Sequence, residues 1–441
     1  MSERVEIAFK QHYVRTSDQP SSFEYAMMAD KESNYDWERD GEPVVYAIMN
    51  AAEIPEAAAS DIQNILADKY FDFDEAASGE ESEFSYDSYY TESSTTDEKW
   101  QEDWRGFERS LKTESRFFSR AASNLLSSVF DGIDKMQTRQ GRSLVAEAGP
   151  NTSISSFYRA RYFQSDDFLE DAIARPDKHV GSPPSSFAKA GRMNAHGISV
   201  FYGANNPAVA IAEVRPPVGS KVVVARFDII RPIRLLDLTA LDLVTSSGSV
   251  FDSTYIERLE QTMFLRNLSH RITIPVMPDD ESLEYLATQA IADFLASENS
   301  PPLDGILFPS VQTAGAALNV VLFHKASRVE EIELPKGTEI TSNIGYMTED
   351  GWEDDFTVYE EISKNTEQAT TTDNFTFVSF PEISSFDSRP FTLKVNLEDV
   401  SVHIVEAVKY ETHPSQVRRH RWEKQVVESQ NVDTSTLSIE L

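Results

Sequence analysis

The stretch Ala190–Pro217, AGRMNAHGISVFYGANNPAVAIAEVRPP, decides how the rest of the chain is interpreted. Its middle part, Ile198–Tyr202, is a short apolar run that predicts a buried strand. A helix is then expected to begin at Asn206, which suits the N-cap, and Pro207, which suits the first helical position. Two further prolines, at 216 and 217, end this helix. A strand, a turn and a helix in direct succession indicate a mixed α and β architecture.

Three side chains of this stretch are not explained by packing alone. Arg192 lies in a loop, and Tyr202 ends the strand, where α/β sheets border ligand crevices. Glu213 lies in the apolar run Ala208–Val214, so we expect its carboxylate to be buried. A buried carboxylate is costly unless it is paired or functional. Two explanations stay open for Glu213, namely a buried ion pair with an arginine and a catalytic role.

Four more polar side chains lie on or beside apolar strands. Arg159 and Arg161 alternate within the predicted strand Phe157–Phe163, so both point to the same face. Ser310 follows the apolar run GILFP, and Asn319 begins the last apolar strand. Each has an ordinary alternative, such as a surface ion pair, a turn serine or a strand cap. As a set they suit a dinucleotide, because arginines bind pyrophosphate and a carboxylate stabilises an oxocarbenium-like state.

Composition excludes several classes of function. The chain has 441 residues, with 73 acidic and 40 basic side chains and a formal net charge of −33. Nucleic acids and anionic membranes are therefore poor partners, since both are bound through Lys and Arg. There is no cysteine, which excludes disulfides, thiolate catalysis and Cys-ligated zinc. The eight histidines show no metal-ligand spacing, so no metal is expected. Without a signal peptide or a long apolar segment, a cytoplasmic protein is expected.

Hydrophobic periodicity divides the chain into an all-helical N-terminal domain and an α+β domain. The aromatic and apolar residues from Trp100 to Ile133 recur at helical spacing and are expected to belong to the first of these domains. The C-terminal part is expected to contain a strand pair, Phe391–Leu397 and Val402–Val408. The predicted divisions are an acidic helical domain at 1–140 with a flexible acidic insert at 71–98, a linker at 141–156, a core at 157–330 and a C-terminal extension at 331–441.

The chain resembles the RES-domain family, which is named after an Arg, a Glu and a Ser. The matching blocks occur in family order and are YRAR (158–161), AGRMNAHGISVFYGA (190–204), AIAEVRP (210–216), EYLATQAIADFL (284–295), DGILFPSV (304–311) and NVVLF (319–323). The resemblance implies a fold like that of ADP-ribosyltransferases, with NAD⁺ as substrate and no permanently bound cofactor. The helical N-terminal part resembles the HEPN-like domain that precedes RES in longer members.

The resemblance also implies roles for individual residues. The catalytic Arg, Glu and Ser of the family match Arg159, Glu213 and Ser310. The residues expected to bind the substrate are Arg192, Tyr202, Arg161 and Asn319.

Members of this family are bacterial toxins, and this implies an activity and a partner. The expected reaction is cleavage of the nicotinamide–ribose bond of NAD⁺, with phosphate or water as acceptor. Transfer of ADP-ribose to a protein is the alternative. An Xre-type antitoxin is the expected partner, in a toxin–antitoxin pair or in phage defence, and a homo-oligomer stays open. A non-catalytic nucleotide-binding module and a HEPN-type ribonuclease are further alternatives. The ribonuclease is disfavoured because no histidine lies between His12 and His179.

Overall fold

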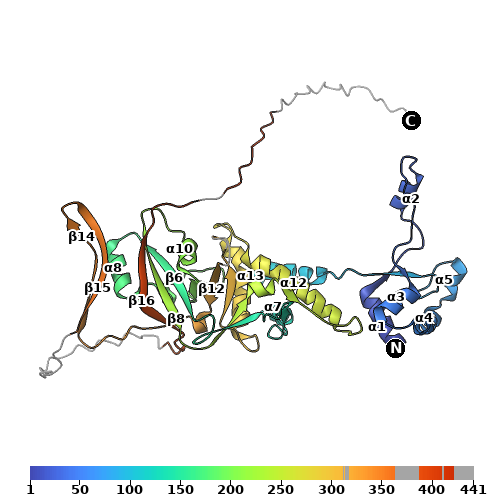
Figure 1. Ribbon diagram of the computed structural model, residues 1–441, viewed down its shortest axis with the longest axis horizontal. Helices are drawn as coiled ribbons and strands as arrows, with labels where there is room; N and C mark the ends of the chain where they lie inside the picture. Colours follow the sequence, from blue (N-terminus) through green and yellow to red (C-terminus); the bar gives the residue numbers. More distant parts are fainter. Residues whose placement is uncertain (311, 313–316, 363–386, 410–411, 422–441) are drawn as a thin grey trace, which may run out of the picture.

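The computed structural model describes residues 1–310, 312, 317–362, 387–409 and 412–421. Two parts follow one another along the chain (Figure 1). The apolar side chains between Val5 and Tyr90 form a core of their own. Those that follow, from Trp104 onward, form the cores of a larger domain that combines helices with one large mixed sheet.

The larger domain is built on a nine-stranded sheet with the order β13-β16-β8-β6-β7-β12-β11-β9-β5. Most neighbours are antiparallel, while β11 runs parallel to β9 and β13 parallel to β16. β8 reads VVVARF at its centre because both of its faces are buried. The strands are β5 (Val145–Ala148), β6 (Ser156–Phe163), β7 (Phe201–Ala204), β8 (Lys221–Ile229), β9 (Ile233–Asp237), β11 (Gly305–Pro309), β12 (Leu318–Leu322), β13 (Val329–Glu330) and β16 (Leu393–Ile404).

Helices cover both faces of this sheet. α10 (Pro207–Val214) packs on one face, against Ala160 of β6 and Val222 of β8. α8 (Asp166–Ala174) packs on the other face, through the core that contains Phe157 and Val223. The remaining helices of this domain are α6 (Glu98–Thr113), α7 (Arg120–Val129), α9 (Pro176–His179), α11 (Leu238–Leu241), α12 (Tyr255–Thr273) and α13 (Glu281–Ser297).

The predicted start of α10 is confirmed in detail. Asn206 is the N-cap, and its side chain accepts a hydrogen bond from the Val209 amide at 3.0 Å. Pro207 takes the first position, where its missing N–H costs nothing. The helix ends at Arg215, which adopts a left-handed backbone with φ 45°.

The N-terminal part contains strands as well as helices, in contrast to the predicted all-helical domain. A three-stranded sheet accompanies the helices because the aromatic side chains of Phe84 and Tyr90 are drawn into the core beside Phe9. Within the predicted insert at 71–98, Phe84, Ser88 and Tyr90 are therefore buried, whereas most of its other described side chains are exposed. The elements are α1 (Ser2–His12), β1 (Tyr13–Arg15), α2 (Ser22–Ala29), β2 (Glu42–Pro43), α3 (Val44–Ala52), α4 (Glu56–Tyr70), α5 (Phe73–Ser78) and β3 (Tyr89–Glu92).

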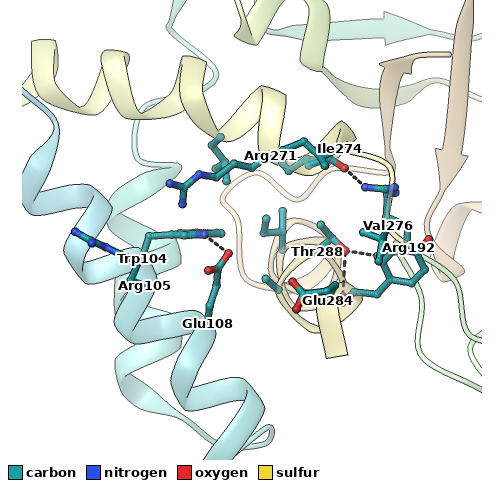
Figure 2. Close-up of a pocket in the computed structure, with 14 residues that line it drawn as sticks. Trp104, Arg105, Glu108, Arg192, Arg271, Ile274, Val276, Glu284 and Thr288 are labelled. Atoms are coloured by element: carbon teal, nitrogen blue, oxygen red, sulfur yellow. Dashed lines mark hydrogen bonds between the residues drawn. The ribbon is translucent and has the colours of Figure 1, made fainter. Parts of the chain in front are cut away.

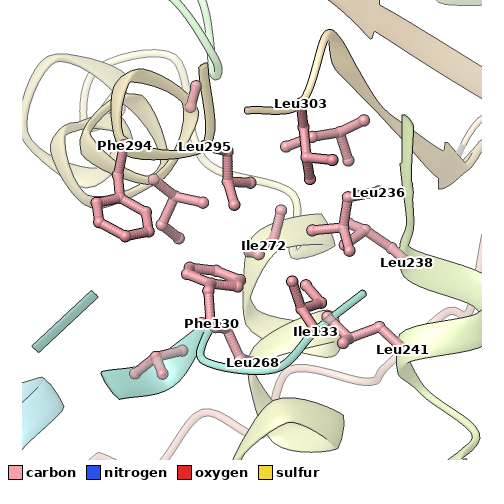
Figure 3. Close-up of a cluster of buried hydrophobic side chains, with 14 of the residues drawn as sticks. Phe130, Ile133, Leu236, Leu238, Leu241, Leu268, Ile272, Phe294, Leu295 and Leu303 are labelled. Carbon is pink, nitrogen blue, oxygen red and sulfur yellow. The ribbon is translucent and has the colours of Figure 1, made fainter. Parts of the chain in front are cut away.

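The boundary between the hydrophobic cores lies between Tyr90 and Trp104, earlier in the chain than the predicted domain boundary at residue 140. α6 and α7 contribute Trp104, Phe107 and Val129 to the core that α12 and α13 share with the large sheet. Figure 3 shows Phe130 and Ile133, which follow α7, among leucines from α12, α13 and β9. The predicted linker contains the edge strand β5. Helical spacing found these helices, but spacing does not say which core they join.

The C-terminal extension differs from the predicted strand pair. One strand, β16, pairs with β8 along its length, and a register shift between Asn396 and Val400 accommodates the extra residues. A ribbon of β14 (Thr338–Thr348) and β15 (Gly351–Ile362) packs against α8. Among the described residues, no helix is both long and apolar enough to cross a membrane.

Candidate functional site

Glu213 and Asn319 are held together at the point where α10 meets β12. The Asn319 Nδ2 atom donates a hydrogen bond to Glu213 Oε2 at 2.9 Å. Asn319 is 3% exposed, and its Oδ1 atom is buried without a hydrogen-bond partner among the described residues. The amide therefore fixes the carboxylate with one end and leaves an acceptor with the other.

The expectation that Glu213 is buried is wrong, because its side chain is exposed. α10 is short and lies on the sheet with one side, so only Val209 and Ala210 are buried. Glu213 lies in the last turn, next to the end of the helix. A buried ion pair between Glu213 and an arginine is therefore not the explanation, because the described partner of the carboxylate is the neutral amide of Asn319. An exposed carboxylate anchored to a buried amide is accessible to a ligand.

Ser310 lies at the same end of the sheet as Asn319. β11 and β12 form an antiparallel pair in which Phe308 is opposite Asn319, and Ser310 comes directly after β11. The Ser310 amide donates to the Ala317 carbonyl at 2.9 Å, and its Oγ accepts from the Gln312 amide at 3.2 Å. Since Oγ acts as an acceptor there, its own proton is left for another partner.

The hydroxyl of Tyr202 is fixed by two hydrogen bonds. The hydroxyl donates to Asn194 Oδ1 and accepts from the Met193 amide, both at 3.0 Å. Burial raises the pKa of Tyr202 to about 12, so the phenol is neutral at physiological pH. Its ring packs against the core of α12 and α13. Tyr202 thus positions the loop before it, and because the residue is only partly buried, its expected stacking on a ligand stays a prediction.

Asn194 is a structural residue of this site that the sequence reasoning missed. Its side-chain amide donates to the carbonyls of Lys189, Ala195 and Ile198. An Asn in a loop of small residues is typical of such side-chain-to-backbone bonds, and this was the available signal. The neighbouring Gly191 is required by space, because a Cβ there would lie 2.7 Å from Asn194 Oδ1.

Arg192 points to the junction of α12 and α13, and its guanidinium bonds there rather than to Glu213. Nη1 donates to the Ile272 carbonyl at 2.6 Å, and the guanidinium lies 5.2 Å above the ring of Tyr285. The Thr288 hydroxyl donates to the Arg192 carbonyl. Arg192 lines a cavity of about 310 Å³ that α6 closes on the opposite side (Figure 2).

Arg159 joins β6 to β7 where the two strands part. β6 pairs with β8 along its length but with β7 only at Tyr158 and Ala204. The Arg159 Nη1 atom bridges the gap by donating to the Tyr202 carbonyl at 2.9 Å, and its guanidinium lies 5.3 Å above the Phe201 ring. Burial, followed by the charge of Arg161, lowers the pKa of Arg159 to about 10, so it stays protonated at neutral pH.

The strand register places the arginine pair and the Glu213–Asn319 pair on opposite faces of the sheet. Arg159 is opposite Ala225 of β8, and Arg161 is opposite Val223, so both point to the face covered by α8. Arg161 donates there to the His179 carbonyl at 2.8 Å. Asn319 is opposite Ala204, which packs under α10 on the other face. The arginines share a face as expected, but they are not brought to Glu213.

The comparison with known families identifies this domain. Residues 157–341 match the family model described as RES domain. The chain contains a RES domain. The match runs from β6 into β14 and includes every block on which the resemblance was based. The RES match does not reach residues 1–156, so the HEPN-like nature of the N-terminal part stays a prediction. No curated protein and no solved structure matches the chain.

The RES domain positions a small set of polar groups on one face of its sheet. Glu213, Asn319 and Ser310 gather at the ends of α10, β11 and β12, while Tyr202 and Arg192 lie further along the same face. Among the described residues, no three His, Asp or Glu side chains form a group that could hold a metal ion.

Proposed function

We propose that the RES domain cleaves the nicotinamide–ribose bond of NAD⁺, with Glu213 as the catalytic carboxylate. The observation that carries this proposal is the Glu213–Asn319 pair, which lies inside the residues that match the RES family. A carboxylate beside a glycosidic bond stabilises the positive charge that develops on the sugar as the bond breaks. The exposed position of Glu213 allows the ribose to reach it.

The reaction proceeds by loss of nicotinamide. The leaving nicotinamide takes the electron pair of the C–N bond, and the anomeric carbon carries positive charge beside the Glu213 carboxylate. Phosphate or water then adds to that carbon, and addition of water releases one proton. Phosphate gives ADP-ribose 1-phosphate, and water gives ADP-ribose.

Asn319 and Ser310 complete the site with one acceptor and one donor. The unpartnered Oδ1 of Asn319 accepts a hydrogen bond from a ribose hydroxyl or from the carboxamide of nicotinamide. The Ser310 hydroxyl donates a hydrogen bond to the ribose or to the acceptor, while its oxygen accepts one from the Gln312 amide. Arg159 acts indirectly, by holding β7 against β6 through the Tyr202 carbonyl.

Transfer of ADP-ribose to a protein is the second candidate function. The observation that favours it is again the exposure of Glu213, since a side chain of another protein could approach the anomeric carbon at this surface.

Release of nicotinamide from NAD⁺ by the purified full-length chain tests both candidates. The assay is run with phosphate, without phosphate, and with a bacterial protein extract and NAD⁺ labelled in its adenylate part. Release that requires phosphate supports phosphorolysis, and release without it supports hydrolysis. Label retained on protein supports ADP-ribosylation. Absence of nicotinamide release in all three arms would refute the proposed function.

A further inference from the structure

The strands β14 and β15 form a two-stranded ribbon at one end of the larger domain (Figure 1). One side of this ribbon packs on α8. Ile344 is buried in the core that also contains Leu169 of α8, and the Ser342 hydroxyl donates to the Glu170 carbonyl at 3.2 Å. Successive residues of a strand point to opposite sides, so the neighbours of Ser342 and Ile344 in β14 point away from α8.

The side that points away from α8 carries exposed aromatic and apolar side chains. Tyr359 is opposite Thr341 and Trp352 is opposite Met347, and the register shift between these two pairs keeps both rings on this side. Tyr359, Trp352 and Met347 are 58%, 53% and 73% exposed. We call this side the outer face of the ribbon. It is an apolar surface that no other strand of the described chain pairs with.

Trp352 is held in a fixed position on the outer face. Its ring lies across Gly345, where a Cβ would come within 2.6 Å of the ring. Its indole nitrogen donates a hydrogen bond to Asp354 Oδ1 at 3.1 Å. The ring is therefore preorganised beside a carboxylate, with about half of its surface exposed.

The ribbon is also strongly acidic. Residues 338–362 contain eight acidic side chains and no Lys or Arg. Glu339, Glu361 and Asp354 share the outer face with the two rings. The ion pairs found among the described residues include none of the eight acids. Two such ribbons repel each other, so the outer face selects a basic partner.

Exposed rings beside unpaired carboxylates favour arginine over lysine. A guanidinium forms two parallel hydrogen bonds to a carboxylate and also stacks on an aromatic ring. Trp352 and Asp354 offer both contacts next to each other. Tyr359 and Glu361, two residues apart on the same strand and on the same face, offer them a second time.

The same chain contains a segment with this chemistry. Residues 417–421 read VRRHR, so three arginines occur within four residues, and all of them are exposed. The ion pairs among the described residues do not include Arg418, Arg419 or Arg421. Figure 1 shows this part of the chain extended and apart from the ribbon of its own chain. An extended segment can bind to a ribbon without refolding.

We propose that the outer face of the ribbon binds residues 417–421 of a second copy of this chain. The arginines pair with the carboxylates of the outer face and stack on Trp352 and Tyr359. Each copy has one ribbon and one arginine segment, so two copies exchange segments and form a closed dimer. The arginine segment and nearly all of the ribbon lie beyond residue 341, where the RES match ends. The contact does not depend on cleavage of NAD⁺.

Sedimentation equilibrium of the full-length chain at about 50 mM and about 500 mM salt tests this proposal. A dimer is expected at micromolar concentration in low salt, and high salt is expected to weaken it at least about tenfold, since exposed charges are screened. Neutralising the segment with Arg418→Gln/Arg419→Gln/Arg421→Gln is expected to weaken the dimer by at least the same factor in low salt. The matched control removes three other exposed arginines and is expected to dimerise like the wild type; it is Arg109→Gln/Arg116→Gln/Arg120→Gln.

A mixture of two variants shows which surfaces meet. The ribbon variant Asp354→Asn/Glu361→Gln and the segment variant each lack one half of the contact and are expected to be monomeric alone. Mixed together they are expected to form a heterodimer, because the intact ribbon of one meets the intact segment of the other. This recovery also shows that both variants are folded. Trp352→Ala changes no charge and is expected to weaken the dimer, which separates stacking from a general effect of charge.

Three outcomes would overturn the proposal. The wild type is monomeric at every concentration in low salt, or its dimer is unchanged in the segment variant, or the mixed variants do not associate while the wild type does. The first outcome leaves the ribbon without this occupant. The second and third place the dimer contact on another surface.

Discussion

Glu213 keeps its carboxylate at the surface through one hydrogen bond to a buried amide. Asn319 belongs to the central strand β12, so its position is fixed by the sheet, whereas Glu213 lies near the end of a short helix. The hydrogen bond from Asn319 thereby fixes the exposed Glu213 carboxylate relative to the sheet. A catalytic carboxylate needs this combination, because it must be accessible and also held in one place.

Removal of the Asn319 amide is expected to lower turnover. Asn319→Ala deletes one hydrogen bond to a carboxylate, worth about 1.5–3 kcal/mol, so kcat for nicotinamide release should fall about 10- to 100-fold. In the Glu213→Gln background the same substitution should have a smaller effect, because the carboxylate that it positions is gone. Equal effects in both backgrounds would show that Asn319 does not act through Glu213.

Glu6 makes the stability of the N-terminal part depend on pH. It accepts hydrogen bonds from Lys69, Tyr70 and Lys10, and these bonds, that of Lys69 foremost, lower its pKa from 4.5 to about 2. The stability that the ionised group contributes is present above pH 4.5. It is lost as the pH falls toward 2, because the unfolded chain then binds a proton that the folded chain resists.

Glu6→Gln is therefore expected to lower the melting temperature of the N-terminal part at pH 7 but to have almost no effect near pH 2. Thermal unfolding followed by circular dichroism over this pH range measures the difference. Glu3→Gln, exposed on the same helix, is the control. A Glu6→Gln effect that is the same at every pH would contradict the assignment.

At the scale of elements, the side chain of Gln261 on α12 caps the C-terminal end of α7. The Gln261 amide of α12 donates to the carbonyls of Ser128, Val129 and Asp131 at 3.0 to 3.1 Å. These carbonyls lie at and just beyond the end of α7, where a helix no longer supplies the regular amide donors to its last carbonyls. Gln261 is 7% exposed, so water does not replace it freely.

Gln261→Leu is expected to destabilise the larger domain by about 1–3 kcal/mol, because three buried or partly buried carbonyls lose their described side-chain donor while the volume is nearly kept. Denaturant unfolding measures the change. Gln289→Leu on α13, which removes comparable bonds to the Gly191 and Asn194 carbonyls, should cost a similar amount but should also disturb the Arg192 loop. An unchanged midpoint for Gln261→Leu would show that α7 is capped in another way.

Local sequence signals predicted the elements better than they predicted the site. Asn206 and Pro207 define the start of α10, and the apolar runs define β8, β11 and β12, because these features act over a few residues. The exposure of Glu213 could not be read in the same way. An apolar helix buried on all sides and a short helix lying on a sheet have the same composition.

The face on which a strand residue lies was also outside the reach of the sequence. Alternation shows that Arg159 and Arg161 share a face, and the structure agrees. Whether that face is also the face of Asn319 depends on the register between β6, β7 and β12, which is set by contacts far apart in the chain. The Arg192 cavity depends on α6 in the same way, since no local signal links these segments.

At the scale of the whole molecule, the folded unit that contains the family match begins before residue 157, where the match starts. α6 and α7 lie outside residues 157–341, yet Trp104, Phe107 and Val129 are buried in the core around α12 and α13 (Figures 1 and 3). The N-terminal part before them has its own core, and its described contacts to the loop before α12 include a hydrogen bond from Gln11 to the Ser253 carbonyl.

A chain that begins at residue 141 is therefore expected to aggregate or to unfold without cooperativity, because it exposes the apolar faces of α12 and α13 that α6 and α7 cover. A chain that begins at residue 96 keeps both helices and is expected to unfold in one cooperative transition. Thermal unfolding and size-exclusion chromatography compare the two. A stable, monomeric chain from residue 141 would show that α6 and α7 are dispensable for the core.

The central claim is that Glu213 breaks the nicotinamide–ribose bond of NAD⁺, and steady-state nicotinamide release by the wild type and Glu213→Gln tests it most directly. Glu339→Gln, an exposed glutamate on β14, serves as the control. The account predicts that Glu213→Gln lowers kcat by about 10²–10³-fold with little change in KM, because the carboxylate acts on charge that appears only in the transition state. Wild-type kcat in Glu213→Gln would contradict it.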